Sequence, residues 1–188
     1  MKDILQDIVK HTHGLGFLDL VKISGDGSET AIDSMAEDRS VILQGTFNKP
    51  QAEMSGTFGM PQLGKLDIHL KCPEYKDKAK ITVITGERNG ATLPTGIHFE
   101  NEKGDFKNDY RFMNAEIINE KLKTVKFKGV KWDVEIEPTV ANVQRFNFQS
   151  IANTEHNSFV VRTENNTLIF SFGDQASHGG EFVFANGV

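Results

Sequence analysis

The chain has 188 residues, 38% hydrophobic and 25% charged, which is the composition of an ordinary globular protein with a buried core. Its formal net charge of −5 argues against unspecific nucleic-acid binding by the whole surface, but not against a local basic patch. No apolar run approaches the roughly 18 residues of a membrane-spanning helix, and one cysteine, Cys72, excludes a disulfide framework and fits a reducing cytoplasm.

Short alternating or β-branched runs dominate the chain and predict antiparallel sheets. These runs lie at residues 18–24, 28–33, 39–47, 51–58, 80–85, 97–100, 107–113, 132–137, 158–163, 167–172 and 180–186. Residue pairs typical of hairpin turns separate several of them, namely Asn89-Gly90, Asn165-Asn166 and Gly179-Gly180.

Three stretches, residues 2–13, 61–71 and 138–152, predict helices. Apolar or small residues recur along them at helical spacing: Ile4, Leu5, Ile8 and Thr12; Leu63, Leu66 and Leu70; Val140, Val143, Phe146 or Asn147, and Ile151. Pro61 and Pro138 stand at the expected first helical positions of the second and third helices.

The order of these elements repeats. One β-α-β-β-β unit is written three times, and the leading strand is missing from the first copy. Such a repeat predicts a quasi-symmetric α+β fold with helices on one side and antiparallel sheets on the other.

Residues 114–131 separate the second and third copies and carry five lysines without a strong amphipathic period. Two interpretations fit this composition equally. The segment is either an extended connector between two domains or a solvated strand with an alternating lysine face.

Motifs of enzyme chemistry are missing from the sequence, which has no Gly-rich phosphate loop, nucleophile elbow or paired-cysteine motif. His11 and His13 lie at i and i+2 of a predicted helix and point apart, which argues against a shared metal. Cys72 has no catalytic partners near it in sequence and is interpreted as structural. We therefore expect no enzymatic activity, no metal and no cofactor.

The polar faces of the predicted helices are neutral to basic although the protein is acidic. They carry Lys2, Gln6, Lys10 and His13; Gln62, Lys65, His69 and Lys71, with Lys76 and Lys78 just beyond; and Asn142, Arg145 and Gln149. Basic faces gathered on one surface would attract phosphate without reading bases. The alternative is that they are plain solvated helix faces.

Five segments stand in order along the chain, and the strands within 158–174 and 179–188 follow them. They are ILQDIVK at 4–10, AIDSMAEDRSVIL at 31–43, LGKLDIHLKC at 63–72, IHFENEKGDFKNDYRFM at 97–113 and WDVEIEPTVANVQRFNFQSI at 132–151. Together they resemble the first pore helix, the Ser-Met strand corner, the second pore helix, the strands that close domain one and the start of domain two in DNA sliding clamps. The likeness is to two-domain clamps, such as proliferating cell nuclear antigen and the clamps of tailed phages.

This resemblance implies the clamp fold. Residues 1–114 would be domain one, 115–131 the interdomain connector, and 132–188 the first half of domain two, since a two-domain clamp has four units and this chain has three. Protomers would pair the edge strands at 107–113 and 180–186 head to tail, as a homotrimer if the chain is complete.

The resemblance also implies the function of a phage-like processivity factor of DNA replication. Such a protein would work in the cytoplasm, at the replication site, and would not bind a membrane. The ring would encircle duplex DNA without sequence specificity and hold a DNA polymerase and a clamp loader through short peptide motifs. The implied DNA contacts are Lys10, Lys65, His69, Lys71, Lys76 and Arg145. The implied peptide pocket consists of Met35, Val41 and Leu43 with Ile117, Ile118 and Leu122 from the connector.

Two other classes of protein remain open. One is a β-rich small-ligand-binding protein, in which a barrel encloses an apolar cavity lined by Phe17, Phe47, Phe58, Phe99 and Phe112. The other is a viral structural or decoration protein, which would assemble without DNA or peptide motifs. The three helices fit neither class as well as they fit a clamp.

Overall fold

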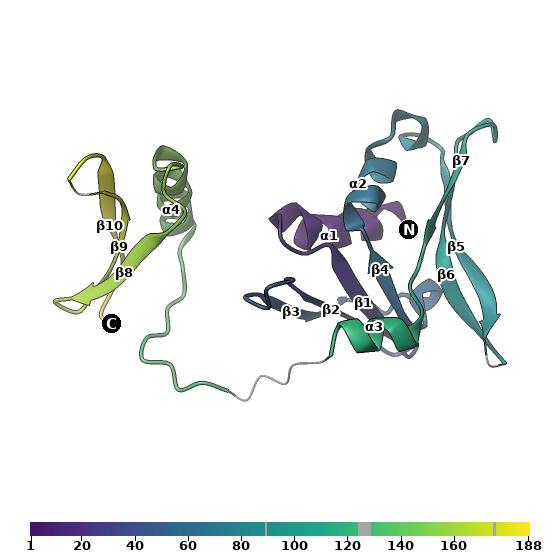
Figure 1. Cartoon of the computed structure of the whole chain (residues 1–188), viewed down its shortest axis with the longest axis horizontal. Coiled ribbons are helices and arrows are strands. Elements are labelled where there is room, and N and C mark those ends of the chain that lie inside the picture. Colours follow the sequence, from purple (N-terminus) through teal and green to yellow (C-terminus); the bar gives the residue numbers. More distant parts are fainter. Residues whose placement is uncertain (89, 124–128, 175) are drawn as a thin grey trace. The chain divides into compact units, whose positions relative to one another are not determined.

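The computed structural model describes residues 1–88, 90–123, 129–174 and 176–188 (Figure 1). The chain divides into two compact units, unit 1 at Met1–Lys126 and unit 2 at Phe127–Val188, with the boundary inside the predicted connector 115–131. Residues 124–128 of that connector, including two of its lysines, lie outside the described residues. Helices accompany sheets whose strand pairs are all antiparallel in the described part, which confirms the α+β prediction.

Unit 1 contains two antiparallel sheets. The first has the order β3-β2-β1-β4 and consists of β1 (Leu20–Gly25), β2 (Thr30–Met35), β3 (Ile42–Thr46) and β4 (Gly56–Pro61). The second has the order β5-β6-β7 and consists of β5 (Lys80–Arg88), β6 (Ala91–Glu100) and β7 (Lys107–Arg111). The helical elements are α1 (Lys2–His11), α2 (Leu63–Lys71), α3 (Ala115–Lys121) and the short 3-10 turns His13–Leu15, Ala52–Met54 and Pro73–Tyr75.

The helices α1 and α2 and both sheets build the core of unit 1. α1 and α2 pack against each other (Figure 1). The buried cluster takes Leu5, Ile8 and Val9 from α1; Leu63, Leu66 and Leu70 from α2; Val21, Ile23, Phe58 and Met60 from the first sheet; and Ile97, Phe99 and Tyr110 from the second. Burial of one such large apolar side chain contributes about 1.5–3 kcal/mol, so the two repeats of unit 1 depend on each other for stability.

The start of α2 differs from its prediction. Pro61 is the last residue of β4, and α2 begins at Leu63 after Gln62, whose φ of 54° is left-handed. The backbone N–H of Leu63 donates to the Asp19 carbonyl (3.2 Å), and that of Gly64 donates to Asp19 Oδ1 (3.1 Å). The cap therefore comes from a residue far away in the sequence, which local propensity does not reveal.

Residues 115–121 form a helix rather than the predicted extended connector. Asn114 caps α3 by accepting a hydrogen bond from the Ile117 N–H (3.0 Å). Just before it, Met113 and Gly59 exchange two backbone hydrogen bonds of 2.9 and 2.7 Å, which bring the chain to β4. Ile118 is fully buried against β4, so this half of the connector belongs to unit 1.

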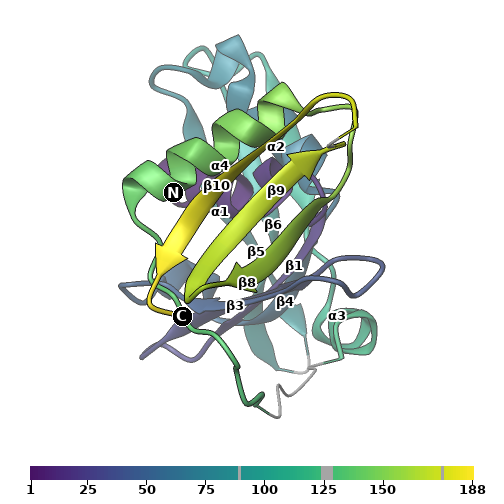
Figure 2. The ribbon, with the colours of Figure 1, turned by 90° about the vertical axis from the view of Figure 1, so that its left-hand side faces the viewer.

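Unit 2 contains one helix on one sheet. The helix α4 (Val140–Ala152) packs on the sheet of β8 (Phe159–Glu164), β9 (Thr167–Gly173) and β10 (Gly179–Asn186) and runs roughly along the strands (Figure 2). The strand order is β10-β9-β8. The Phe146 ring contacts the rings of Phe159, Phe170 and Phe172 edge-on, with centroids 5.0–5.9 Å apart. Aromatic packing thus fixes α4 on the sheet.

Two predictions at the start of unit 2 are wrong. Thr139 caps α4 by accepting from the Asn142 N–H (3.2 Å), so Pro138 precedes the cap instead of opening the helix. Residues 132–137 form no strand. The corresponding strand of unit 1, β4, pairs with β1 of the other repeat, and the described residues of unit 2 contain a single repeat.

Candidate partner pocket and helix faces

The corner between β2 and β3 is closed by backbone hydrogen bonds. The two strands end in the pairs Ser34–Leu43 and Met35–Ile42. Beyond them, the Ala36 N–H donates to the Val41 carbonyl (2.9 Å). The methionine is therefore the last residue of a strand, and the turn itself is formed by the residues after it.

Polar residues of the turn supply its geometry. Asp38 Oδ1 accepts from the Ser40 N–H (3.0 Å) and from the Ser40 hydroxyl (2.7 Å), which lowers the pKa of Asp38 below its ordinary value. Arg39 takes a left-handed φ of 62°. Because these residues form the bend, the Met35 side chain is not needed for the turn.

Met35 faces away from the core. Ser34 is buried and donates its hydroxyl to the Leu20 carbonyl (2.6 Å), and successive strand residues point to opposite faces. On the Met35 side lies a pocket of about 20 Å³. Its lining is Asp33, Ser34, Met35, Ile42, Leu43, Gln44, Leu122 and Lys123.

The structure brings together three of the six predicted pocket residues, Met35, Leu43 and Leu122. Ile118 is fully buried on the side of α3 that packs on β4. Ile117, also in α3, is 45% exposed and does not line the pocket. Val41 lies in the corner, where its carbonyl closes the turn. Leu122 lines the pocket because α3 packs on β4 and ends beside the β2–β3 hairpin.

Sequence reasoning missed Ile42, Asp33, Gln44 and Lys123. Ile42 is 45% exposed, and counting hairpin pairs outward from the bend would have placed it opposite Met35. Asp33 and Lys123 give the apolar floor a rim with both signs of charge. A pocket this small does not enclose a small molecule, but it can seat the tip of an apolar side chain when the flexible Met35 shifts.

A second concave surface lies between α1 and α2. This groove of about 500 Å³ is lined by Gln6, Val9, Lys10, His13, Gly14, Asp67, Leu70 and Lys71. It brings together Lys10 and Lys71, two of the predicted DNA contacts. Asp67 pairs with Lys71 at 2.6 Å and partly offsets its charge.

The remaining predicted DNA contacts of unit 1 differ from one another. Lys65 and Lys76 are exposed. His69 instead lies with its ring against Phe99, centroids 5.2 Å apart, and partial burial lowers its pKa. Part of the His69 ring is therefore turned toward the core, and its role as a DNA contact stays a prediction.

In α4 the predicted apolar and polar residues do not separate into an inner and an outer face: Phe146 packs on the sheet, whereas Val140 and Ile151 are exposed. Asn142 donates to the Phe184 carbonyl (2.7 Å) from the sheet side of the helix, where Gln149 and Asn153 lie against the glycines of β9 and β10. Arg145 is exposed. The outward face is mixed rather than basic, with exposed Val140, Phe148 and Ile151 beside Gln144, Arg145 and Asn147.

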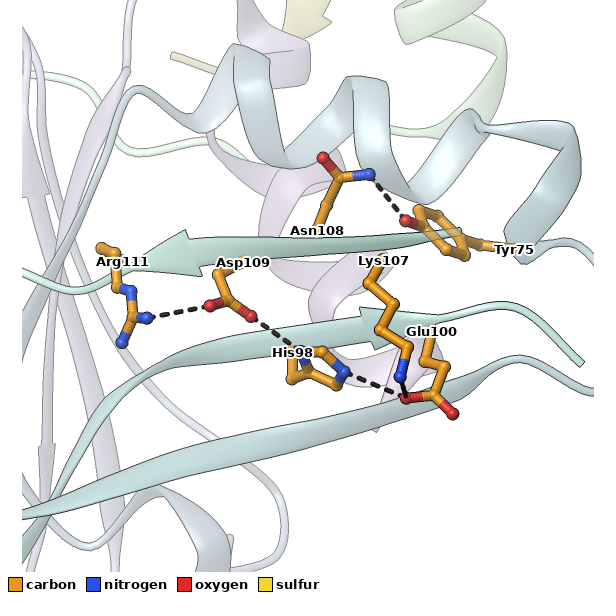
Figure 3. A network of polar contacts seen from close by, with 7 residues as sticks. All are labelled: Tyr75, His98, Glu100, Lys107, Asn108, Asp109 and Arg111. Carbon is orange, nitrogen blue, oxygen red and sulfur yellow. Dashed lines mark hydrogen bonds and ion pairs between the residues drawn. The ribbon is translucent and has the colours of Figure 1, made fainter. Parts of the chain in front are cut away.

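A polar network covers one face of β6 and β7 (Figure 3). His98 Nδ1 lies 2.7 Å from Asp109 Oδ1, and its Nε2 lies 3.4 Å from Glu100 Oε2. Arg111 donates to Asp109 (2.8 Å), and Lys107 pairs with Glu100 (3.1 Å). These contacts lower the pKa of both carboxylates. Charges of this kind protect an edge strand from unselective pairing.

Within the described ranges, no three His, Cys, Asp or Glu side chains gather in a way that could hold a metal ion. Nor is any helix in those ranges both long and apolar enough to cross a membrane.

No family model and no curated protein matches the chain. Among solved structures, the chain is similar to one in the complex described as the C-terminal region of FEN-1 bound to A. fulgidus PCNA. The TM-score is 0.45 and the sequence identity 10%, with 97% of this chain and 69% of that chain covered. At these values the likeness says nothing about what this protein binds.

Proposed function

We propose that the protein is a DNA sliding clamp that holds partner proteins by short peptides docked at the pocket around Met35. The observation that carries the proposal is the meeting of Met35 and Leu43 with Leu122, a residue about 80 positions away, in one pocket. The resemblance of the sequence to clamps named these three residues as neighbours. An apolar floor with a charged rim fits a peptide with an apolar anchor.

The DNA-facing surface in this proposal is the α1–α2 groove. Lys10 and Lys71 would meet phosphates there, and Lys65 is exposed on the same helix as Lys71. Contacts to phosphate carry no sequence information, which suits a protein that slides. The Asp67–Lys71 pair keeps the attraction modest, which favours movement over tight binding.

Ring closure in this proposal uses two free strand edges. β7 and β10 each stand at the end of a sheet among the described strands. Head-to-tail pairing of β7 with β10 of the next protomer would join protomers in a closed ring, for which we propose a trimer. The charged network on β7 would then select the partner edge.

A fluorescein-labelled C-terminal peptide of a DNA polymerase tests the pocket by fluorescence anisotropy. We expect Met35→Asp to weaken the peptide's Kd at least about tenfold, because a carboxylate would be buried under the peptide's apolar anchor. Val183→Asp, at a 41% exposed position of unit 2, is the control and should leave the Kd unchanged. An unchanged Kd for folded Met35→Asp would remove the pocket from the proposal.

The small-ligand alternative requires one cavity lined by its five predicted phenylalanines. Phe58 stacks on Phe112 with centroids 4.4 Å apart, Phe99 packs against Tyr75 at 5.4 Å, and Phe17 is 49% exposed. The predicted phenylalanines therefore do not line one cavity. The viral structural protein stays a prediction, and a failure to bind both DNA and peptide would favour it.

A further inference from the structure

We propose that unit 1 binds an extended peptide of alternating acidic and apolar residues in a groove of about 260 Å³, here named the arginine groove. The groove lies between β4, the β5–β6 hairpin and residues 111–116, which lead into α3. Its described lining shares no residue with the Met35 pocket or the α1–α2 groove. The inference therefore does not rest on the proposed function.

The first observation is an open backbone edge on β4, which stands at the end of its sheet. On the free side of this strand, Gly59 exchanges two backbone hydrogen bonds with Met113. Because the hydrogen-bonding direction of a strand repeats at every second residue, the N–H and C=O of Thr57 point to the same side. The chain turns into α3 after Asn114, and no backbone group of the described residues bonds Thr57 on that side. An extended peptide laid along this edge would continue the ladder.

The second observation is an apolar floor beside that edge. The rings of Phe58 and Phe112 stack with centroids 4.4 Å apart, and Leu93 and Pro94 of β6 also line the groove. Phe112 is fixed there because its N–H donates to the Thr95 carbonyl (2.9 Å). The groove is smaller than the roughly 300–1,000 Å³ of small-molecule sites, so an apolar side chain of a peptide fits it better than a whole ligand does.

The third observation is the charge at the rim. Arg88 is exposed at the end of β5 and has no ion pair within the described residues. Arg111 donates from Nη2 to Asp109 (2.8 Å), as Figure 3 shows. With Glu116, the lining carries two positive charges and one negative. Guanidinium groups next to an apolar floor complement the carboxylates of an acidic peptide, which they can bind through paired hydrogen bonds.

The same surroundings argue against nucleic acid as the occupant. Glu116 lines the groove and Asp109 lies beside Arg111, so a continuous row of phosphates would meet carboxylates as well as arginines. In an extended peptide, successive side chains point to opposite sides, so acidic residues can meet the arginines while apolar residues meet the floor. The open backbone edge, the floor and the arginines therefore select the same kind of partner.

Fluorescence anisotropy of the full chain with two peptides tests the charge complementarity. One labelled, end-blocked peptide alternates glutamate with leucine, and the other has lysine in place of each glutamate. We expect the glutamate peptide to bind at least about tenfold more tightly than the lysine peptide. Equal affinities would overturn the proposal.

A charge reversal at the rim tests the place of binding. Arg88→Glu should weaken binding of the glutamate peptide and strengthen binding of the lysine peptide, each at least about fivefold. Lys103→Glu, in the exposed turn between β6 and β7 and outside the groove, is the matched control. At physiological salt it should change both Kd values by less than about twofold, because distant exposed charges are screened. Equal effects of the two variants would show general attraction between charges and would overturn the proposal.

The Thr57 amide reports on the backbone pairing. Residue-resolved NMR should show its exchange with solvent slowed at least about tenfold by saturating glutamate peptide. Met35→Asp should leave the Kd of this peptide unchanged while it weakens the polymerase peptide, so failure of this groove and failure of the proposed function give different results. Binding that leaves Thr57 exchange at its free rate, or that is lost in Met35→Asp, would overturn the proposal.

Discussion

A Cβ atom on Gly59 would lie 2.8 Å from Cδ1 of Ile118, so α3 lies directly on the backbone of β4. The close approach fixes the height of α3 above the first sheet. Leu122, whose N–H donates to the Ile118 carbonyl (2.8 Å), follows at the end of the helix and forms one wall of the pocket. A glycine in β4 is thus one condition for the pocket beside Met35.

Gly59→Ala should therefore destabilise the protein by about 1–3 kcal/mol, the usual cost of overpacking, and should weaken peptide binding at the pocket. Urea unfolding and peptide anisotropy measure the two effects. Gly45→Ala in β3 is the control, since its Cβ would meet only Ile32 Cγ2 at an ordinary 3.6 Å. Equal effects of the two substitutions would contradict the role given to Gly59.

Leu122 and Ile117 lie on the same short segment and should behave differently. Leu122→Ala removes a 7% exposed side chain from the pocket wall, so peptide affinity should fall at least about tenfold. Ile117→Ala removes a 45% exposed side chain that does not line the pocket, and the peptide's Kd should stay within about twofold. Isothermal titration with the same peptide measures both, and reversed outcomes would place the peptide on the outer side of α3.

Lys10→Ala and Lys71→Ala should each flatten the dependence of duplex-DNA affinity on salt, by up to about one unit of log–log slope per lost phosphate contact. Titrations of a labelled duplex between low and moderate salt measure the slope. Exposed Lys49 in the loop after β3 supplies the control substitution. His69→Gln should leave the slope unchanged because that ring packs on Phe99. A slope that responds to Lys49 as much as to Lys10 would contradict the groove assignment.

The network around His98 predicts a response to acid. The hydrogen bond with His98 is the main cause that holds the pKa of Asp109 below its ordinary 3.8. For Glu100 the main cause is the hydrogen bond from Lys107, which holds its pKa below the ordinary 4.5. Because the unfolded chain binds more protons in this range, the stabilisation is complete above the ordinary values and is lost as pH falls through the lowered ones. His98→Ala should therefore raise the pKa of Asp109 and shift acid unfolding to higher pH.

Carbon-13 titration of the side-chain carboxyl groups measures that shift directly. His156→Ala, at an exposed position of unit 2, serves as the control. An Asp109 pKa that stays where it is in His98→Ala would mean that Arg111 alone holds the carboxylate.

Most strands could be predicted because their pattern is local. The hairpin β8–β9 was predicted from β-branched alternation around Asn165-Asn166, both of which take positive φ in the turn. The start of α2 could not be predicted, because its cap comes from Asp19 across the fold. The helix α3 had a readable signal, Asn114 as a capping residue with Glu116 in the first turn, which the lysines after it obscured.

The faces of α4 were misjudged for a different reason. Helical spacing groups Phe146 or Asn147 with Val140, Val143 and Ile151, but it does not tell which of these residues meets the sheet. Phe146 decides that question through its contacts with three strand phenylalanines. Of the candidate site, the Met35 corner followed from the resemblance, whereas Ile42 and Lys123 required the pairing register and the path of α3.

The most direct test of the central claim is hydrogen exchange of the full chain with and without the polymerase C-terminal peptide. The pocket account predicts slower exchange in the β2–β3 hairpin, from Ser34 to Gln44, and at the end of α3 near Leu122, with unit 2 unchanged. Binding that protects other segments and leaves these two at their free rates would contradict the claim that partners dock at Met35.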